Sequence, residues 1–138
     1  MKSDLELIND KNFWVRLNVA KRISIEHLPR MMNDENYYIR LNVAKKINIE
    51  HLPKMMNDEN FIVRYEVAKR IADEGGAFAR EHLPKMMNDK NHWVRLEVAR
   101  RIDPKFLGEM FGFDFDPIYQ EGLIKVLSER EDLKKCKL

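Results

Sequence analysis

Hydrophobic residues in this chain fall at helical spacing, and the same spacing returns several times along the sequence. In the segment 37–47, Ile39, Val43 and Ala44 share one face when residues are placed at about 100° steps. Asn42 points away from that face, as do the two lysines near the end of the segment. The pattern therefore predicts a long amphipathic helix whose apolar arc is wide enough to contact several neighbouring elements.

A shorter apolar segment, 48–56, follows this helix. Its Ile49 and Leu52 share a face, whereas Pro53 lacks an amide donor and limits the segment to a brief helix or 3₁₀ turn. Double methionines fall on the same face as the leucine of each copy, so we expect them to pack in the core. These pairs are Met31-Met32, Met55-Met56 and Met86-Met87.

The turn sequence Asn-Asp-x-Asn precedes each of these long segments and defines a repeat. It begins at positions 9, 33, 57 and 88, so successive starts are 24, 24 and 31 residues apart. The extra residues of the third copy lie around 73–80 and include Gly75-Gly76, which we interpret as a helix stop. A fixed period of this size is typical of a solenoid, in which stacked helix pairs bury one continuous core.

We therefore predict an all-α fold, a right-handed solenoid of about four two-helix repeats of 24–31 residues with degenerate caps. Residues 1–138 would form a single helical-repeat domain. Its repeats are placed at about 9–32, 33–56, 57–87 and 88–111, with a C-terminal capping helix and tail at 112–138. In that last part a helix should open at Asp116-Pro117, and Gln120 stands where the other copies have an arginine.

Each long helix carries an arginine inside its apolar arc, and each preceding turn carries an aspartate. Because an unpaired buried guanidinium is costly, we expect the arginines to pair with the aspartates, within one unit or across to the next. The expected ladder consists of Asp10, Asp34, Asp58 and Asp89 with Arg16, Arg40, Arg64 and Arg95. Its predicted role is structural rather than catalytic.

A large apolar residue occupies the second position of each long helix, and a basic residue follows on the same face. These residues are Trp14, Tyr38, Ile62 and Trp93, followed by Lys21, Lys45, Lys69 and Arg100. Outward rows of this kind usually mark an interaction site, so we expect the eight residues to contact a partner. The alternatives are coverage of the aromatic rings by neighbouring segments and compensation of the helix dipole by the cations. By contrast, Phe13, Tyr37 and Phe61 are expected to pack on the core side.

The expected partner is a protein or peptide, and an acidic segment is one candidate. The basic row leaves nucleic acid open as an alternative, although a net charge of +2 does not by itself favour it. No membrane contact is expected, because no apolar run approaches the roughly 18 residues that a membrane span needs. The N-terminal segment does not resemble a signal peptide, so a cytoplasmic location is the expectation.

Signals for catalysis or metal binding are weak. His27, His51 and His82 recur once per repeat, too far apart to share a zinc ion, and are expected at the surface or in turns. The single cysteine, Cys136, excludes a disulfide within the chain. No serine lies next to a histidine, and no glycine-rich phosphate loop is present. We therefore expect a protein that is not an enzyme and holds no metal or cofactor.

The sequence VRxxVAxxI after an Asp-containing turn resembles two related helical-repeat families, the HEAT-like repeats and the leucine-rich-repeat variant. The residues that match are Val15-Arg16, Val19-Ala20, Leu28 and Asp34 with their later equivalents, over about residues 5–111. The repeat of the variant has the same length and joins one α-helix to one short helix, although methionine replaces its usual leucine at Met31 and Met55.

Both resemblances imply scaffolding and binding roles, and HEAT-like folds include occasional nucleic-acid enzymes. Some variant proteins also carry a cysteine-rich iron–sulfur segment, for which this chain has no cysteines.

Overall fold

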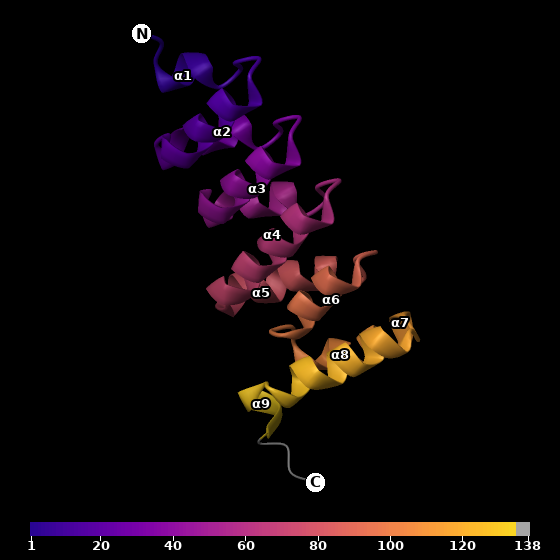
Figure 1. The fold of residues 1–138 in the computed structure, drawn as a ribbon. Helices are drawn as coiled ribbons and strands as arrows, with labels where there is room; N and C mark the ends of the chain where they lie inside the picture. Colours follow the sequence, from indigo (N-terminus) through magenta and orange to yellow (C-terminus); the bar gives the residue numbers. More distant parts are fainter. Residues whose placement is uncertain (135–138) are drawn as a thin grey trace. The chain divides into compact units, whose positions relative to one another are not determined.

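The computed structural model describes residues 1–134, and no strand occurs in that range (Figure 1). The chain divides into two compact units, Met1–Val67 and Ala68–Leu138. Cys136 and the end of the predicted tail lie outside the described residues.

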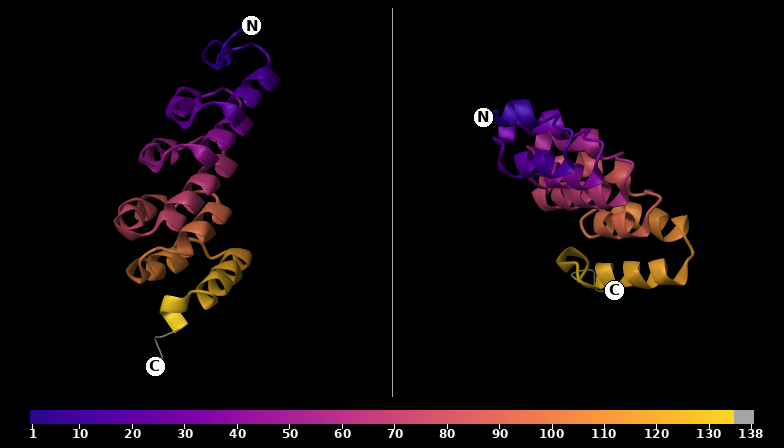
Figure 2. Two further views of the ribbon diagram at one scale, coloured as in Figure 1. Left: turned by 90° about the vertical axis from the view of Figure 1, so that its left-hand side faces the viewer. Right: turned by 45° about the horizontal axis from the view of Figure 1, so that its top comes forward.

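The first unit alternates long α-helices with 3₁₀ helices. Its elements are α1 (Asp4–Leu7), α2 (Phe13–Arg22), η1 (Ile25–Met31), α3 (Tyr37–Lys46) and η2 (Ile49–Met55). Helices α2 and α3 lie side by side in one layer, and the 3₁₀ helices form a second layer beside them (Figure 2). Pro29 and Pro53 lie inside the 3₁₀ helices, as expected for short elements that lack one amide donor.

Helix α4 (Phe61–Glu74) begins in the first unit and ends in the second. The following elements are α5 (Gly76–His82), η3 (Leu83–Met86), α6 (His92–Ala99), η4 (Pro104–Phe106), α7 (Leu107–Phe113), α8 (Pro117–Ser128) and α9 (Glu131–Lys134). The additional residues of the third repeat lengthen α4 and create α5. Between them Gly75 and Gly76 adopt φ angles of 68° and 57°, which favour glycine, so the predicted helix stop is present.

The repeated apolar positions form the core of each unit. Val19 and Val43 in the first unit, and Val94 and Val98 in the second, have no exposed surface. Among the double methionines, Met31, Met55, Met86 and Met87 are buried, and Met32 and Met56 are half-buried. The first methionine of every pair therefore packs in the core, as predicted, and the second does so fully only in the third repeat.

His82 is buried, with 7% of its surface exposed, so its predicted place at the surface or in a turn is wrong. The insertion supplies most of α5, and His82, whose equivalents His27 and His51 lie in 3₁₀ helices, is the last residue of α5. Its ring there lies edge-on to Phe78, with 4.6 Å between the centroids. His27 and His51 are half-buried.

Within residues 1–134, no three histidine, cysteine or carboxylate side chains gather closely enough to hold a metal ion. The same residues include no helix with the length and apolar character needed to cross a membrane.

Candidate partner-binding surface

The Asn-Asp-x-Asn turns determine how each long helix begins. In the second turn, Asp34 Oδ1 accepts a hydrogen bond of 2.9 Å from the backbone N–H of Asn36. Asn36 Oδ1 in turn accepts one of 2.8 Å from the backbone N–H of Tyr38, the second helical residue. The same cap bonds are made by Asn12, Asn60 and Asn91. The cap uses only the backbone of the second residue and leaves its side chain free to project from the helix.

The second-position side chains are all exposed. Trp14 is 65% exposed, Tyr38 41%, Ile62 36% and Trp93 53%. None of the four is covered by a neighbouring segment among the described residues. Their exposure meets the geometric requirement of a binding surface, and their contact with a partner stays a prediction.

The first helical residues do not pack on the core side as predicted. Tyr37 is 41% and Phe61 39% exposed, and Phe13 is half-buried. These residues lie at the N-terminal end of their helices, beside the turn, where the apolar layer already ends. The rings of Phe13 and Tyr37 lie beside the next ring instead, with 4.8 Å between the centroids of Phe13 and Trp14 and 6.5 Å between those of Tyr37 and Tyr38. Helix α3 therefore begins with two exposed aromatic residues, and helix α2 begins with the half-buried Phe13 beside the exposed Trp14.

Three of the four predicted basic residues are free. Lys21, Lys45 and Lys69 are exposed and form no ion pair within residues 1–134. The cations beside two of them have partners. Arg22 lies 2.8 Å from the carboxylate of Asp4, and Lys46 Nζ donates to the carbonyl of Lys21 at the end of α2. The negative ends of the helix dipoles are therefore partly compensated by the neighbouring cations. The side chains of Lys21, Lys45 and Lys69 remain available to a partner.

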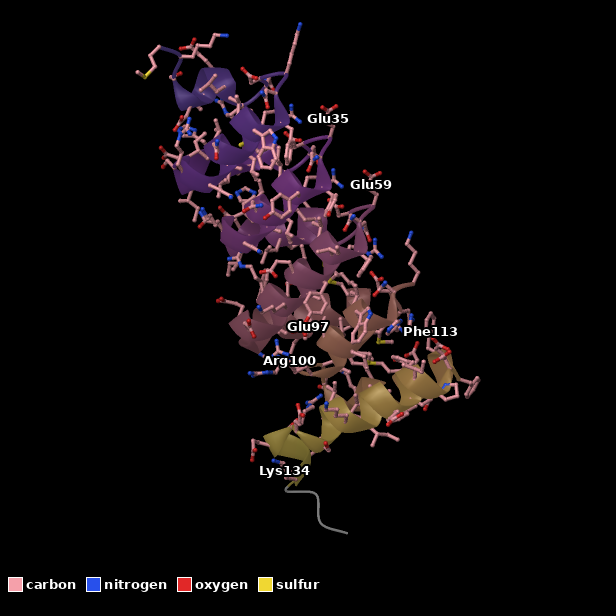
Figure 3. All side chains as sticks on the ribbon, in the orientation of Figure 1. Glu35, Glu59, Glu97, Arg100, Phe113 and Lys134 are labelled. Atoms are coloured by element: carbon pink, nitrogen blue, oxygen red, sulfur yellow. The ribbon has the colours of Figure 1, made fainter. Side chains whose placement is uncertain are left out.

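Arg100 differs from the three lysines because carboxylates surround it. Its Nε donates to Glu97 at 2.9 Å (Figure 3). Its Nη2 lies 2.9 Å from the carboxylate of Asp73. Burial opposes the charge of Arg100, but the hydrogen bonds with Glu97 and Asp73 outweigh that effect and raise the pKa of its guanidinium. The fourth predicted basic position therefore offers a neutralised cation.

Helix α8 repeats the same arrangement, although its sequence predicted only a capping helix. Asp114 Oδ1 accepts from the N–H of Asp116, and Asp116 Oδ1 accepts from the N–H of Ile118, as in the other turns. Ile118 is 73% exposed at the second position, and the exposed Lys125 follows on the same face. The sequence feature that could have predicted this fifth turn is Asp114-x-Asp116. It matches the Asp-x-Asn of the other turns if aspartate replaces asparagine as the N-cap residue.

The arginines of the first unit connect successive turns. Arg40 Nε donates to the carboxylate of Asp58 at 2.8 Å, and its Nη1 donates to the backbone carbonyl of Asp34 at 2.7 Å. Arg16 does the same with the carboxylate of Asp34, at 2.9 Å, and the carbonyl of Asp10, at 2.8 Å. Each arginine therefore binds a backbone carbonyl of its own turn and the carboxylate of the next turn. The sequence left open whether the arginines bind within one unit or across to the next, and both kinds of contact occur, through different atoms.

These pairs are well shielded from water. Arg16 and Arg40 are each 6% exposed, and the side chains of Asp34 and Asp58 are each 7% exposed. The hydrogen bond with Asp34 raises the pKa of Arg16, and the bond with Asp58 raises that of Arg40, in both cases against the effect of burial. Among the described residues, no arginine forms a hydrogen bond with the carboxylate of Asp10. That carboxylate accepts from the N–H of Asn12 instead.

The same bonds recur in the later turns. Arg64 donates to the carbonyl of Asp58 at 2.8 Å. Arg95 Nη1 donates to the carbonyl of Asp89 at 2.7 Å, and its Nη2 to the carboxylate of Asp114 at 2.6 Å. In α8, Gln120 Nε2 keeps the bond to its own turn, 2.6 Å from the carbonyl of Asp114. An uncharged, shorter side chain at this position ends the ladder.

Alternating α- and 3₁₀ helices, joined by buried Arg–Asp pairs from turn to turn, define a helical-repeat protein. Among solved structures, the chain is similar to one described as a leucine-rich repeat variant with a novel repetitive structural motif. The TM-score is 0.75 at 31% identity, and the match covers 91% of this chain and 48% of the other. The chain therefore has the leucine-rich repeat variant fold. The predicted resemblance and the predicted all-α repeat class are confirmed.

The chain spans about half the length of that similar protein. No protein-family model and no curated protein matches this sequence.

Proposed function

We propose that this chain is a non-enzymatic scaffold that binds a protein partner through the outward side chains of its long helices. The observation that carries this proposal is the exposure of both tryptophans, 65% for Trp14 and 53% for Trp93. The local fold needs only the backbone N–H of each tryptophan, which the N-cap asparagine binds. Each indole ring lies beside the ring of the preceding residue, with 4.8 Å between the centroids, and more than half of each tryptophan remains exposed.

Exposed rings of this size are favourable for binding because they bring a large, rigid contact area. In protein interfaces, Trp and Tyr are among the residues that most often carry the binding energy. In the first unit, Trp14 and Tyr38 occupy equivalent positions on the adjacent helices α2 and α3, and each has a second ring beside it. A partner that crosses these helices would meet one aromatic pair per repeat.

The charge of the surface favours an acidic partner. Lys21 and Lys45 lie on the same helical faces as Trp14 and Tyr38, and no carboxylate of the described residues pairs with them. An acidic segment would supply that missing charge. Nucleic acid is the alternative, and it is less well supported because Arg22, Lys46 and Arg100 are already engaged within the chain. A phosphate-binding surface would need most of these cations to be free.

Affinity capture from the native host tests the proposal. The Trp14→Ala/Tyr38→Ala double variant should fold normally and lose the partner that the wild type retains after nuclease treatment. Ile25→Ala is the matched control, because Ile25 is a 47% exposed apolar residue of the same unit that lies on a 3₁₀ helix. Equal capture by the double variant would refute the proposed surface. A partner that is lost with nuclease and with rising salt would favour nucleic acid.

A further inference from the structure

Helix α8 exposes a face that helix α6 covers. In α6, Leu96 and Ala99 occupy the fifth and eighth helical positions, and Ala99 has no exposed surface. Leu96 lies against α8, because a Cβ on Gly122 would come within 3.1 Å of the Leu96 side chain. The equivalent positions of α8 are Glu121 and Ile124, both exposed, and Ile124 is 60% exposed. The side of α8 that corresponds to the stacking side of α6 is therefore not covered by residues 1–134.

This face of α8 does not suit a further repeat of the same kind. The eighth position is a fully buried alanine in the four preceding long helices, namely Ala20, Ala44, Ala68 and Ala99. In α8 the larger Ile124 takes that position, and Glu121 stands where α6 has a leucine. A glutamate buried at the fifth position without a partner would be costly. The face therefore requires an occupant with apolar surface for Ile124 and a cation for Glu121.

A suitable cation occurs on α8 itself. Lys125 follows Glu121 by about one helical turn. Both side chains are exposed, and neither forms an ion pair within residues 1–134. The two residues are placed symmetrically about Leu123, so an antiparallel second copy of α8 with a twofold axis at Leu123 brings Glu121 of each copy to Lys125 of the other. A parallel pairing in register would oppose like charges, and so would an antiparallel pairing with its axis at Glu121.

We propose that the exposed face of α8 binds a second copy of this chain, as an antiparallel helix pair with twofold symmetry. In such an interface every contact occurs twice, and this symmetry is the commonest among soluble oligomers. The two Ile124 side chains would lie about 3 Å apart along the helix axis, since each is one residue from the twofold axis and a helix rises about 1.5 Å per residue. They would cover each other beside the two ion pairs. One pair of short helices is a small interface compared with the roughly 1,200–2,000 Å² of a stable complex, so this dimer dissociates readily.

Sedimentation velocity over protein concentrations from about 10 μM to about 1 mM measures this association. Glu121→Lys leaves two cations on each copy and Lys125→Glu leaves two carboxylates, so each variant alone opposes like charges across the axis. An equimolar mixture of the two variants restores both ion pairs in a heterodimer. Ile124→Ala tests the apolar contact with the residue that the other repeats carry, in case a charge variant folds poorly. Glu74→Lys is the matched control, because Glu74 is an exposed glutamate of the same unit that lies on α4.

We expect the wild type and the control to dimerise as the concentration rises. Each charge variant should associate at least about tenfold more weakly, because like charges then face each other, and the mixture should recover the loss. Ile124→Ala should also weaken the dimer. A wild type that stays monomeric at about 1 mM would overturn the proposal. So would an equal loss in the control, unchanged dimerisation in the folded variants, or a mixture that associates no better than its components. These substitutions leave Trp14 and Tyr38 in place, so the result is independent of partner capture by the first unit.

Discussion

Arg40 holds the carboxylate of Asp58 through two hydrogen bonds, of 2.8 Å from Nε and 3.1 Å from Nη2, across the boundary between two repeats. Both side chains are almost fully buried. A buried charge that loses its partner is far more costly than the pair itself is stabilising. The stacking of these repeats therefore depends on a charged contact as well as on apolar packing.

Replacing Arg40 with alanine should destabilise the protein by about 3 kcal/mol or more, because the carboxylate of Asp58 would remain buried without its cation. Urea denaturation followed by circular dichroism measures this change. The double variant Arg40→Ala/Asp58→Asn should recover part of the loss, because asparagine is uncharged and can still accept the N–H bond of Asn60. An Arg40→Ala variant as stable as the wild type would show that the pair does not stabilise the stack.

The repeat architecture was predictable from the sequence because the turn, the cap and the apolar arc all recur with one period. The pairing of each aspartate with a particular arginine was not predictable. Whether Asp34 accepts Arg16 or Arg40 depends on how one helix pair stacks on the next, and the spacing within a repeat does not contain that information. The structure assigns the carboxylate of Asp34 to Arg16 and its backbone carbonyl to Arg40.

Gly75 and Gly108 should respond in opposite directions to substitution by alanine. A Cβ at either position would meet no atom within 4 Å, so packing does not distinguish them. Gly75 has a φ of 68°, and strain of this kind costs about 1–3 kcal/mol, so Gly75→Ala should be destabilising. Gly108 lies in α7 without a positive φ. Gly108→Ala should stabilise the protein by about 0.4–1 kcal/mol, because alanine lowers the conformational entropy of the unfolded chain. The two denaturation midpoints check this prediction, and a loss of equal size in both variants would contradict it.

Tyr119 should retain its proton to unusually high pH. Burial raises the pKa of its phenol, and the nearby Arg95 only partly offsets that effect. Because the folded-state pKa lies above the unfolded value of about 10, the stability contributed is complete below pH 10. It is then lost as the pH rises through the folded-state value. A spectrophotometric titration should show one late tyrosine ionisation that disappears in Tyr119→Phe, and an unchanged titration curve in that variant would refute the assignment.

The second-position residues of the candidate surface and three of its four basic residues were predictable, whereas the ion pairs of Arg100 were not. Helical spacing places Trp14, Tyr38 and Trp93 outward, and they are exposed. Arg100 has the same spacing, but Asp73 in the preceding insertion reaches it, and an insertion breaks the period on which the prediction depends. Ile118 was not predicted as a member because aspartate replaces the asparagine cap of its turn.

The most direct test of the central claim places a photo-crosslinking amino acid at position 14 and, as a control, at position 25. Both side chains are exposed in the first unit, 65% for Trp14 and 47% for Ile25, but only Trp14 lies at the second position of a long helix. Irradiation in the native host should give a covalent adduct with one protein from position 14 and none from position 25. Absence of an adduct at position 14, or the same adducts from both positions, would contradict a partner-binding surface on the long helices.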